Sequence, residues 1–143
     1  MTRTSPRLAL VAITRQGASQ AEALAARLAS RGSDAHLVVA DKFAGPMASV
    51  AAHTNRVIAY QGALSDQIGG LFSGYDQIVF FVSLGAVTRL IAPHLKSKER
   101  DPGVLVVDEA GRFVIPVLSG HVGGANAFAE YLAVTYGDSG IKV

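Results

Sequence analysis

Residues 119–126 of this chain read SGHVGGAN and combine glycine, histidine and asparagine in one short stretch. An apolar run at residues 113–118 precedes the stretch, and a helix-like segment at residues 127–136 follows it. Loops between a strand and a helix are where α/β proteins often bind ligands and carry out chemistry. Glycines let the backbone approach a ligand closely, and a histidine can transfer protons near neutral pH. The pattern therefore predicts a functional site in residues 119–126.

His121 is the candidate acid–base group of this site. The dipole of the following helix would lower the pKa of its imidazole, which would keep the ring neutral and able to accept a proton. Backbone N–H groups at Gly123 and Gly124 could bind a developing oxyanion, and Asn126 could orient a carbonyl group or a water molecule. The alternative is that His121 bonds to a backbone carbonyl as a polar loop residue, with glycines that only permit close packing.

Other catalytic and cofactor-binding patterns are incomplete. Ser119 lacks the flanking glycines of a nucleophile elbow and is expected to be an N-cap or turn residue. No dinucleotide fingerprint follows the first apolar run. Residues 14–19, TRQGAS, could hold a phosphate at a helix start, but a simple turn and cap is the favoured interpretation. The four histidines are scattered, so no metal site is predicted, and the lack of cysteine excludes disulfides and thiolate ligands.

Composition limits the class of protein and its partners. A chain of 143 residues, half of them hydrophobic, is long enough for a core and predicts a single domain over residues 1–143. The net charge of +2 is too balanced to predict a nucleic-acid partner. No hydrophobic leader is seen and the run at residues 8–13 is too short to span a bilayer, so no membrane partner and a cytoplasmic location are expected. The oligomeric state is left open.

Alternating strand-like and helix-like segments predict an α/β fold, a three-layer sandwich with a mostly parallel sheet and a β-hairpin before the last helix. Runs of apolar residues predict strands at 8–13, 35–40, 56–60, 77–83, 104–107 and 113–118. Helical spacing predicts helices at 21–30, 64–72, 86–95 and 127–136, with Ser19 as the first N-cap. Pro93 is expected to distort the last turn of its helix or to end the helix early, and residues 41–55 show no clear pattern.

This order of elements predicts where the site lies. A helical crossover between residues 77–83 and 104–107 makes those strands parallel, and a hairpin makes 113–118 antiparallel to them. The loop with His121 should then face the charged loop at residues 96–102, whereas Gly85 should lie at the opposite edge of the sheet. Exposed Lys and Arg side chains of this loop could bind carboxylates; the alternative is that they are simply solvated.

Several ordered motifs resemble a known family. They are GAVTRLIAP at residues 85–93, KERDPGV at 98–104, VVDEAG at 106–111 and LSGHVGGAN at 118–126. Together they resemble the cobalamin-biosynthesis protein G (CbiG) family, the cobalt-precorrin-5A hydrolases. The resemblance is close over residues 81–129 and vaguer over residues 8–40.

The resemblance implies a reaction and a set of site residues. The substrate would be a cobalt-corrinoid intermediate of cobalamin biosynthesis that carries many carboxylates, and water would open its δ-lactone with loss of acetaldehyde. No cofactor is implied beyond the cobalt that the substrate carries. His121 would activate the water and Asn126 would position a carbonyl group. The implied substrate-binding residues are Ser119, Gly120, Gly123, Gly124, Arg89, Lys98, Arg100 and Asp101.

Two alternatives to a hydrolase domain with its own chemistry around His121 stay open. Members of the resembling family carry a further C-terminal module, so the chain is expected to be the N-terminal part, and the site could lie between modules. The chain would then be a non-catalytic corrinoid-binding or interaction domain, with other corrin-pathway enzymes as candidate partners. A flavodoxin-like phosphate or flavin binder is the third reading. Arg89 is at odds with the expected topology, which places its helix away from His121.

Overall fold

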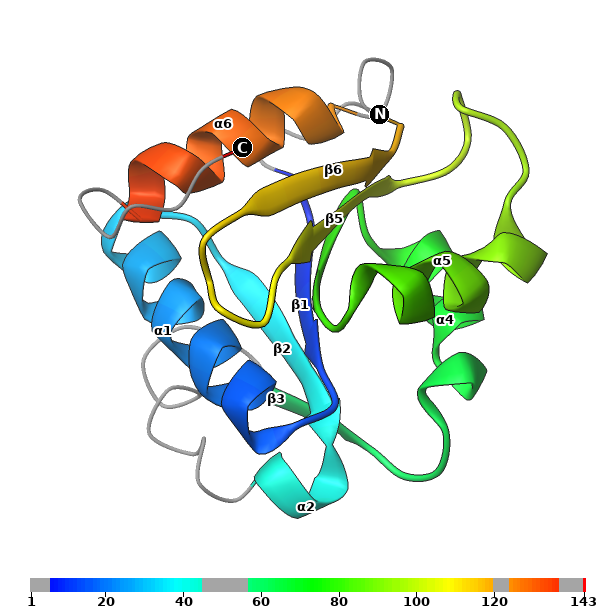
Figure 1. Cartoon of the computed structure of the whole chain (residues 1–143), viewed down its shortest axis with the longest axis horizontal. Helices are drawn as coiled ribbons and strands as arrows, with labels where there is room; N and C mark the ends of the chain where they lie inside the picture. The colour runs from blue at the N-terminus through cyan, green and yellow to red at the C-terminus, as the bar shows by residue number, and fades with distance from the viewer. Residues whose placement is uncertain (1–5, 45–56, 120–123, 137–142) are drawn as a thin grey trace.

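A six-stranded sheet forms the middle layer of the molecule (Figure 1). The computed structural model describes residues 6–44, 57–119, 124–136 and 143. The strand order is β3-β2-β1-β4-β5-β6, and only β6 is antiparallel to its neighbour. The strands are β1 Leu8–Ala12, β2 Ala35–Ala40, β3 Val57–Tyr60, β4 Gln77–Phe81, β5 Gly103–Val107 and β6 Val114–Leu118.

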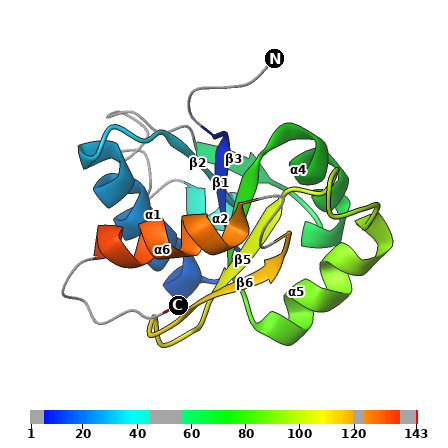
Figure 2. The same ribbon diagram turned by 90° about the horizontal axis from the view of Figure 1, so that it is seen from above.

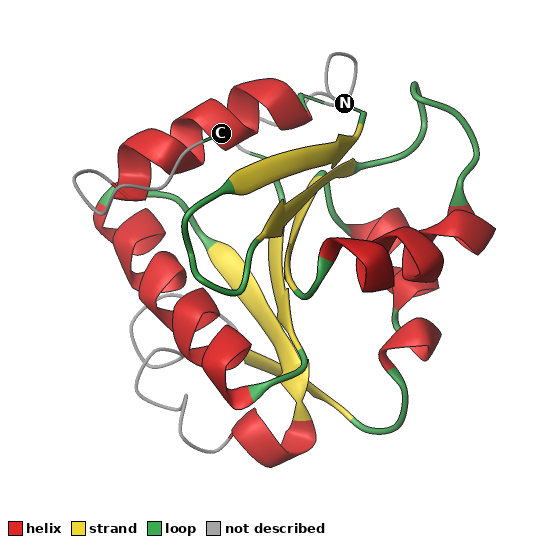
Figure 3. Cartoon of the chain, viewed as in Figure 1, coloured by secondary structure: helices red, strands yellow, loops and turns green. Residues whose placement is uncertain are grey.

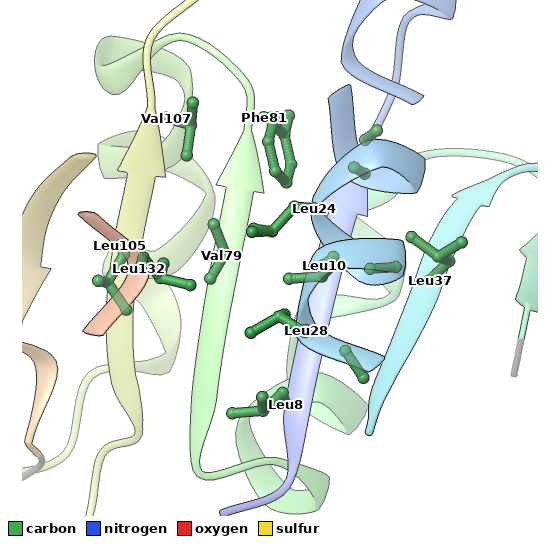
Figure 4. Packing of buried hydrophobic residues seen from close by; sticks show 14 of the residues in the cluster. Leu8, Leu10, Leu24, Leu28, Leu37, Val79, Phe81, Leu105, Val107 and Leu132 are labelled. Atoms are coloured by element: carbon green, nitrogen blue, oxygen red, sulfur yellow. The ribbon is translucent and has the colours of Figure 1, made fainter. Parts of the chain in front are cut away.

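The strands are apolar along their length because both faces of the sheet are covered. β1, β4 and β5 are buried at every position, as expected for parallel strands between two helical layers. Successive side chains point to opposite faces, so each strand feeds two cores. Leu10, Val79 and Leu105 enter the first core, and Figure 4 shows them meeting Leu24 of α1 and Leu132 of α6.

Helices cover both faces of the sheet, as two views at right angles show (Figures 2 and 3). α1 and α6 pack on one face, whereas α4 and α5 pack on the other. Their bounds are α1 Arg15–Ser30, α4 Ile68–Gly74, α5 Leu84–Ile91 and α6 Ala125–Tyr136, with the short turns α2 Asp41–Ala44, η2 Leu64–Asp66 and η3 Ala92–His94. The predicted three-layer sandwich is confirmed. No helix in the described ranges is long and apolar enough to cross a membrane.

The predicted start of the first helix was wrong. α1 begins at Arg15, and its N-cap is Thr14, whose hydroxyl accepts a hydrogen bond from the backbone N–H of Gly17 at 2.9 Å. Ser19 therefore lies inside the helix rather than at its cap. The helix that contains Pro93 ends early, as expected, because α5 gives way to the 3₁₀ turn η3 at Ala92.

The predicted topology at the end of the sheet is confirmed. β4 and β5 are parallel, and β6 returns antiparallel to β5. Pro116 lies in β6, which is the edge strand, where a missing N–H is tolerated. The loop after β6 therefore lies at the end of the sheet where the parallel strands β1 to β5 begin. We call this end of the sheet the amino edge, as distinct from the edge strand β6. Gly85, just after β4, lies at the opposite, carboxyl edge.

Candidate functional site

Two loops that are distant in sequence meet at the amino edge. Ser119 directly follows β6, and Asp101 comes shortly before β5. The hydroxyl of Ser119 donates to the backbone carbonyl oxygen of Asp101 at 3.3 Å, and both residues are buried. The structure thus brings the loop after β6 against the charged loop before β5, as the topology predicted.

The ends of the candidate catalytic loop are held together. The backbone N–H of Ala125 donates to the carbonyl oxygen of Ser119 at 3.2 Å, and that of Phe128 donates to Gly124 at 2.9 Å. Gly124 has φ 80°, a conformation that glycine adopts without strain. The predicted residues Gly120, His121 and Gly123 lie outside the described residues. The described flanks show that this loop leaves β6 and enters α6 at the amino edge.

Ser119 is held in an unusual backbone conformation. Its φ of 58° lies in the left-handed region, and no other described residue except glycine has a positive φ. Side chains in this region cost roughly 1–2 kcal/mol. The hydrogen bonds that Ser119 makes to Asp101 and Ala125 offset this cost and turn the chain sharply out of β6. Strain of this kind is often found at functional sites.

Asp101 fixes the shape of the charged loop. Its two carboxylate oxygens accept from the backbone N–H of Lys96, each at 3.0 Å, and its own N–H donates to the carbonyl oxygen of Ser97 at 2.9 Å. The side chains of Lys98 and Arg100 stay exposed on this closed loop. A cavity of about 210 Å³ opens beside it, and its lining includes Lys96, Arg100, His94 and Phe72. Cations on a fixed loop beside a cavity are suited to holding a carboxylate arm of a larger ligand.

Gln77 is a site residue that the sequence analysis missed. It is buried at the start of β4, with its side chain between Gly103 and Gly124. A Cβ at Gly103 would collide with the amide of Gln77, and one at Gly124 would lie 3.3 Å from its Nε2. The two glycines therefore make room for a buried polar side chain beside the start of α6. The available signal was a polar residue at the head of the otherwise apolar segment QIVFF.

The remaining predicted residues divide between the two edges. Asn126 lies exposed in the first turn of α6, next to Ala125 and Gly124 at the amino edge. Arg89 lies exposed on α5 and lines a different hollow with Ile13, which follows β1 at the carboxyl edge. The structure therefore brings together Ser119, Asp101 and Gly124 and leaves Arg89 apart.

Packing explains why glycine is found at position 17, just after β1. The amide of Gly17 is already bonded to Thr14, and a Cβ on Gly17 would lie 2.8 Å from the carbonyl oxygen of Phe81. Glycine is thus needed where α1 passes close to the end of β4. This geometry fits a turn with a cap better than a phosphate loop.

The fold and the paired loops define a doubly wound α/β domain with a loop cluster at the amino edge of its sheet. A family model described as "Cobalamin synthesis G N-terminal" matches residues 66–141, more than half of the chain, so the chain belongs to this family. The matched region contains every residue that the sequence analysis assigned to the site. The family resemblance stated from the motifs is confirmed.

Two curated relatives each match about half of the chain. A cobalt-precorrin-5A hydrolase from Priestia megaterium is 46% identical over 74 residues, which cover 52% of this chain and 20% of the relative. One from Salmonella typhimurium is 41% identical over 76 residues, which cover 53% of this chain and 22% of the relative. The matched segment thus spans only about a fifth of the length of these relatives.

A solved structure shares the fold across nearly the whole chain. The crystal structure of a cobalamin biosynthesis protein G homologue from Sulfolobus solfataricus matches with a TM-score of 0.66 and 24% identity, covering 96% of this chain and 36% of the other. At this identity the likeness establishes the fold alone. The shared fold includes the N-terminal strands, which precede the region matched by the family model.

Proposed function

We propose that this chain is a substrate-handling module of a cobalt-precorrin-5A hydrolase, which opens the δ-lactone of a cobalt-corrinoid intermediate with loss of acetaldehyde. The observation that carries the proposal is the contact between Ser119 and Asp101, which joins the glycine-rich loop to the basic loop. Both loops lie inside the family match, and about half of the chain matches relatives named cobalt-precorrin-5A hydrolase. The proposal includes a cytoplasmic location and no cofactor of the chain's own, since cobalt travels with the substrate.

In the proposed lactone hydrolysis, different residues of the glycine-rich loop carry out different steps. His121 takes a proton from water, and the water oxygen forms a bond to the lactone carbonyl carbon. Backbone N–H groups at Gly123 and Gly124 stabilise the tetrahedral oxyanion. The lactone C–O bond then breaks to give a carboxylate, and the leaving oxygen, which stays on C20, takes the proton from His121 to become a hydroxyl group. Loss of that hydroxyl proton with cleavage of the bond between C20 and the ring releases C20, its methyl group and its oxygen as acetaldehyde, while the electron pair of the broken bond stays on the ring and is protonated there. A general base contributes roughly 10²–10⁴-fold and an oxyanion donor roughly 10²–10³-fold.

The basic loop supplies recognition in this proposal. Lys98 and Arg100 are exposed on a loop that the carboxylate of Asp101 closes, so they present charge from a defined position. A single exposed ion pair is worth only about 0.2–1 kcal/mol. A substrate with many carboxylates can engage several such pairs at once, and Asn126, in the first turn of α6, would hold a carbonyl group.

The test is acetaldehyde release from cobalt-precorrin-5A by this chain and by its His121→Ala variant. Lys42→Gln, which changes an exposed residue of α2, serves as the control. Loss of release by roughly 10²-fold or more in His121→Ala alone supports the assignment of the base. Equal release in the variant removes His121 from the mechanism.

A second set of variants tests recognition at the amino edge. Lys98→Gln and Arg100→Gln should each raise KM, with little change in kcat, because they remove contacts made equally in ground and transition states. Arg89→Gln removes the same charge at the other edge of the sheet. An equal rise in KM for Arg89→Gln would contradict an amino-edge site.

The alternative is a non-catalytic corrinoid-binding domain. The matched segment covers only about a fifth of the length of the two relatives. This favours the alternative, because the remaining four fifths of such a protein could contain the catalytic groups. Binding of the cobalt corrinoid, followed by its visible absorbance, without any acetaldehyde release would select this alternative.

A further inference from the structure

A second hollow opens at the carboxyl edge and runs along α5 as far as Pro93 and His94. Two cavities of about 310 and 670 Å³ share Ile13, Val82 and Ala86 in their linings and so form one continuous groove. We call it the carboxyl-edge groove. One lobe reaches Ser83 and Gln16 near the start of α1. The other lobe runs along α5 and includes residues Leu64, Asp66, Arg89, Leu90 and His94.

The groove lies where the sheet reverses its order of winding. β1 and β4 are neighbouring parallel strands, but the chain leaves β1 into α1 on one face and leaves β4 into α5 on the other. In open α/β sheets, the crevice outside the carboxyl ends of two such strands is the usual place for a ligand. β4 has five residues, which is about 16 Å of strand. The carboxyl ends where the groove starts are therefore about one strand length from the Ser119–Asp101 contact, although Pro93 and His94 at the far end of the groove also line the cavity beside the charged loop.

The residues that the two lobes share are apolar. Ile13 follows β1 and Val82 follows β4, and adjacent strands are about 4.8 Å apart. Ala86, in the first turn of α5, continues this apolar surface with a small side chain. Ile13 is 38% exposed, which is high for a large apolar residue at the end of a buried strand. An apolar ring system laid over these residues would remove that surface from water.

Arg89 gives the groove a charge preference. Its side chain is exposed, and no hydrogen bond or ion pair within the described part of the chain involves its guanidinium. A free guanidinium presents a planar set of donors that suits a carboxylate, sulfonate or phosphate. Asp66 lines the same lobe, and its carboxylate would repel a second anionic group. The lobe is therefore suited to a ligand with one negative group.

We propose that the carboxyl-edge groove binds an organic monoanion with an apolar ring system, its rings over Ile13, Val82 and Ala86 and its anionic group on Arg89. The volume of the groove is in the range of small-molecule sites. The proposal concerns a second site and does not depend on the hydrolase activity proposed for the amino edge.

The experiment uses the whole chain and two matched probes. The probe 8-anilinonaphthalene-1-sulfonate carries an apolar ring system and one sulfonate, and N-phenyl-1-naphthylamine has the same rings without the charge. Fluorescence titration should show saturable binding of both. Arg89→Gln should weaken the sulfonate probe about tenfold, the effect of roughly one lost charged hydrogen bond, and should leave the neutral probe unchanged. Arg100→Gln, the same change at the amino edge, should alter neither.

The location is checked independently of affinity. Amide chemical shifts of ¹⁵N-labelled protein should move on probe addition at residues 13, 82 and 86, and not at Ser119 or Asp101. Ala86→Phe should abolish binding of both probes while urea unfolding stays cooperative. Equal weakening in Arg89→Gln and Arg100→Gln, shifts centred on the amino edge, or binding that rises with partial unfolding in urea would each overturn the proposal.

Discussion

The hydroxyl of Ser119 reaches the backbone carbonyl of Asp101 across 18 positions of sequence, and this bond ties the exit of β6 to the approach of β5. The antiparallel direction of β6 makes the contact feasible, because it returns the chain to the edge where the parallel strands start. The conformation of Ser119, from which the candidate catalytic loop starts, therefore depends on the basic loop beside it.

Ser119→Ala should lower the free energy of unfolding by about 1 kcal/mol, because it removes a buried hydrogen bond and leaves the carbonyl of Asp101 without this donor. Ser65→Ala, at an exposed position of η2, is the control and should be close to neutral. Urea unfolding followed by circular dichroism measures both, since the chain has no tryptophan. Equal values for the two variants would refute a bonding role for this hydroxyl.

Asp101→Ala should lower the free energy of unfolding by about 1–3 kcal/mol, since the amide of Lys96 loses its acceptor. The neighbouring exposed carboxylate gives the matched control Glu99→Ala, for which we expect a change within about 0.5 kcal/mol. The same urea measurement applies. If Asp101→Ala instead leaves stability intact and raises only the KM for substrate, its carboxylate acts on the ligand rather than on the loop.

Two glycines should respond oppositely to alanine. Gly17→Ala places a Cβ 2.8 Å from the carbonyl oxygen of Phe81, so we expect a loss of about 1–3 kcal/mol. A Cβ on Gly85, in α5, would have no atom within 4 Å, so Gly85→Ala should be neutral or stabilise by up to about 1 kcal/mol through helix propensity. Thermal unfolding of the two variants gives the comparison, and a stabilised Gly17→Ala would contradict the close approach of α1 to β4.

Stability should fall at alkaline pH through Tyr136. Burial raises the pKa of Tyr136 to about 12, although the guanidinium of Arg27 lowers it somewhat. Between pH 10 and 12 the unfolded chain therefore loses this proton while the folded chain keeps it, which favours unfolding by up to about 2–3 kcal/mol. Below pH 10 both states hold the proton and the effect vanishes. Burial also raises the pKa of Tyr60, so Tyr136→Phe should reduce the alkaline loss without removing it. An unchanged pH profile of urea midpoints in this variant would count against the prediction.

The topology was predictable because few connections are allowed between parallel strands. A helical crossover followed by a hairpin leaves one arrangement for β4, β5 and β6, and this arrangement places the loop at Ser119 beside the loop at Asp101. The motifs at residues 85–126 were also sufficient to identify the family.

Other features depend on contacts between distant segments and leave little trace in the local sequence. The cap at Thr14 was missed because Ser19, an equally good capping residue, is nearer the alanine-rich part of α1. Gln77 can be buried because Gly103 and Gly124, which are distant from it in sequence, leave space for its amide group. The carboxyl-edge groove is built from segments around Ile13, Val82 and Arg89, which only the folded sheet brings together.

The sharing of the first core between α1 and α6 has a consequence for biosynthesis. Leu24 and Leu28 belong to the second element of the chain, yet they pack in the same cluster as Phe128 and Leu132 of α6. A ribosome makes the chain from its N-terminus, so α1 can pack on β1, β2 and β4 first, whereas the part of the core that α6 covers stays open until α6 emerges. Long-range closure of this kind slows folding and prolongs exposure of apolar surface. A nascent chain of this protein therefore completes its first core only after α6 has been translated, and until then the apolar surface that α6 will cover is exposed to solvent.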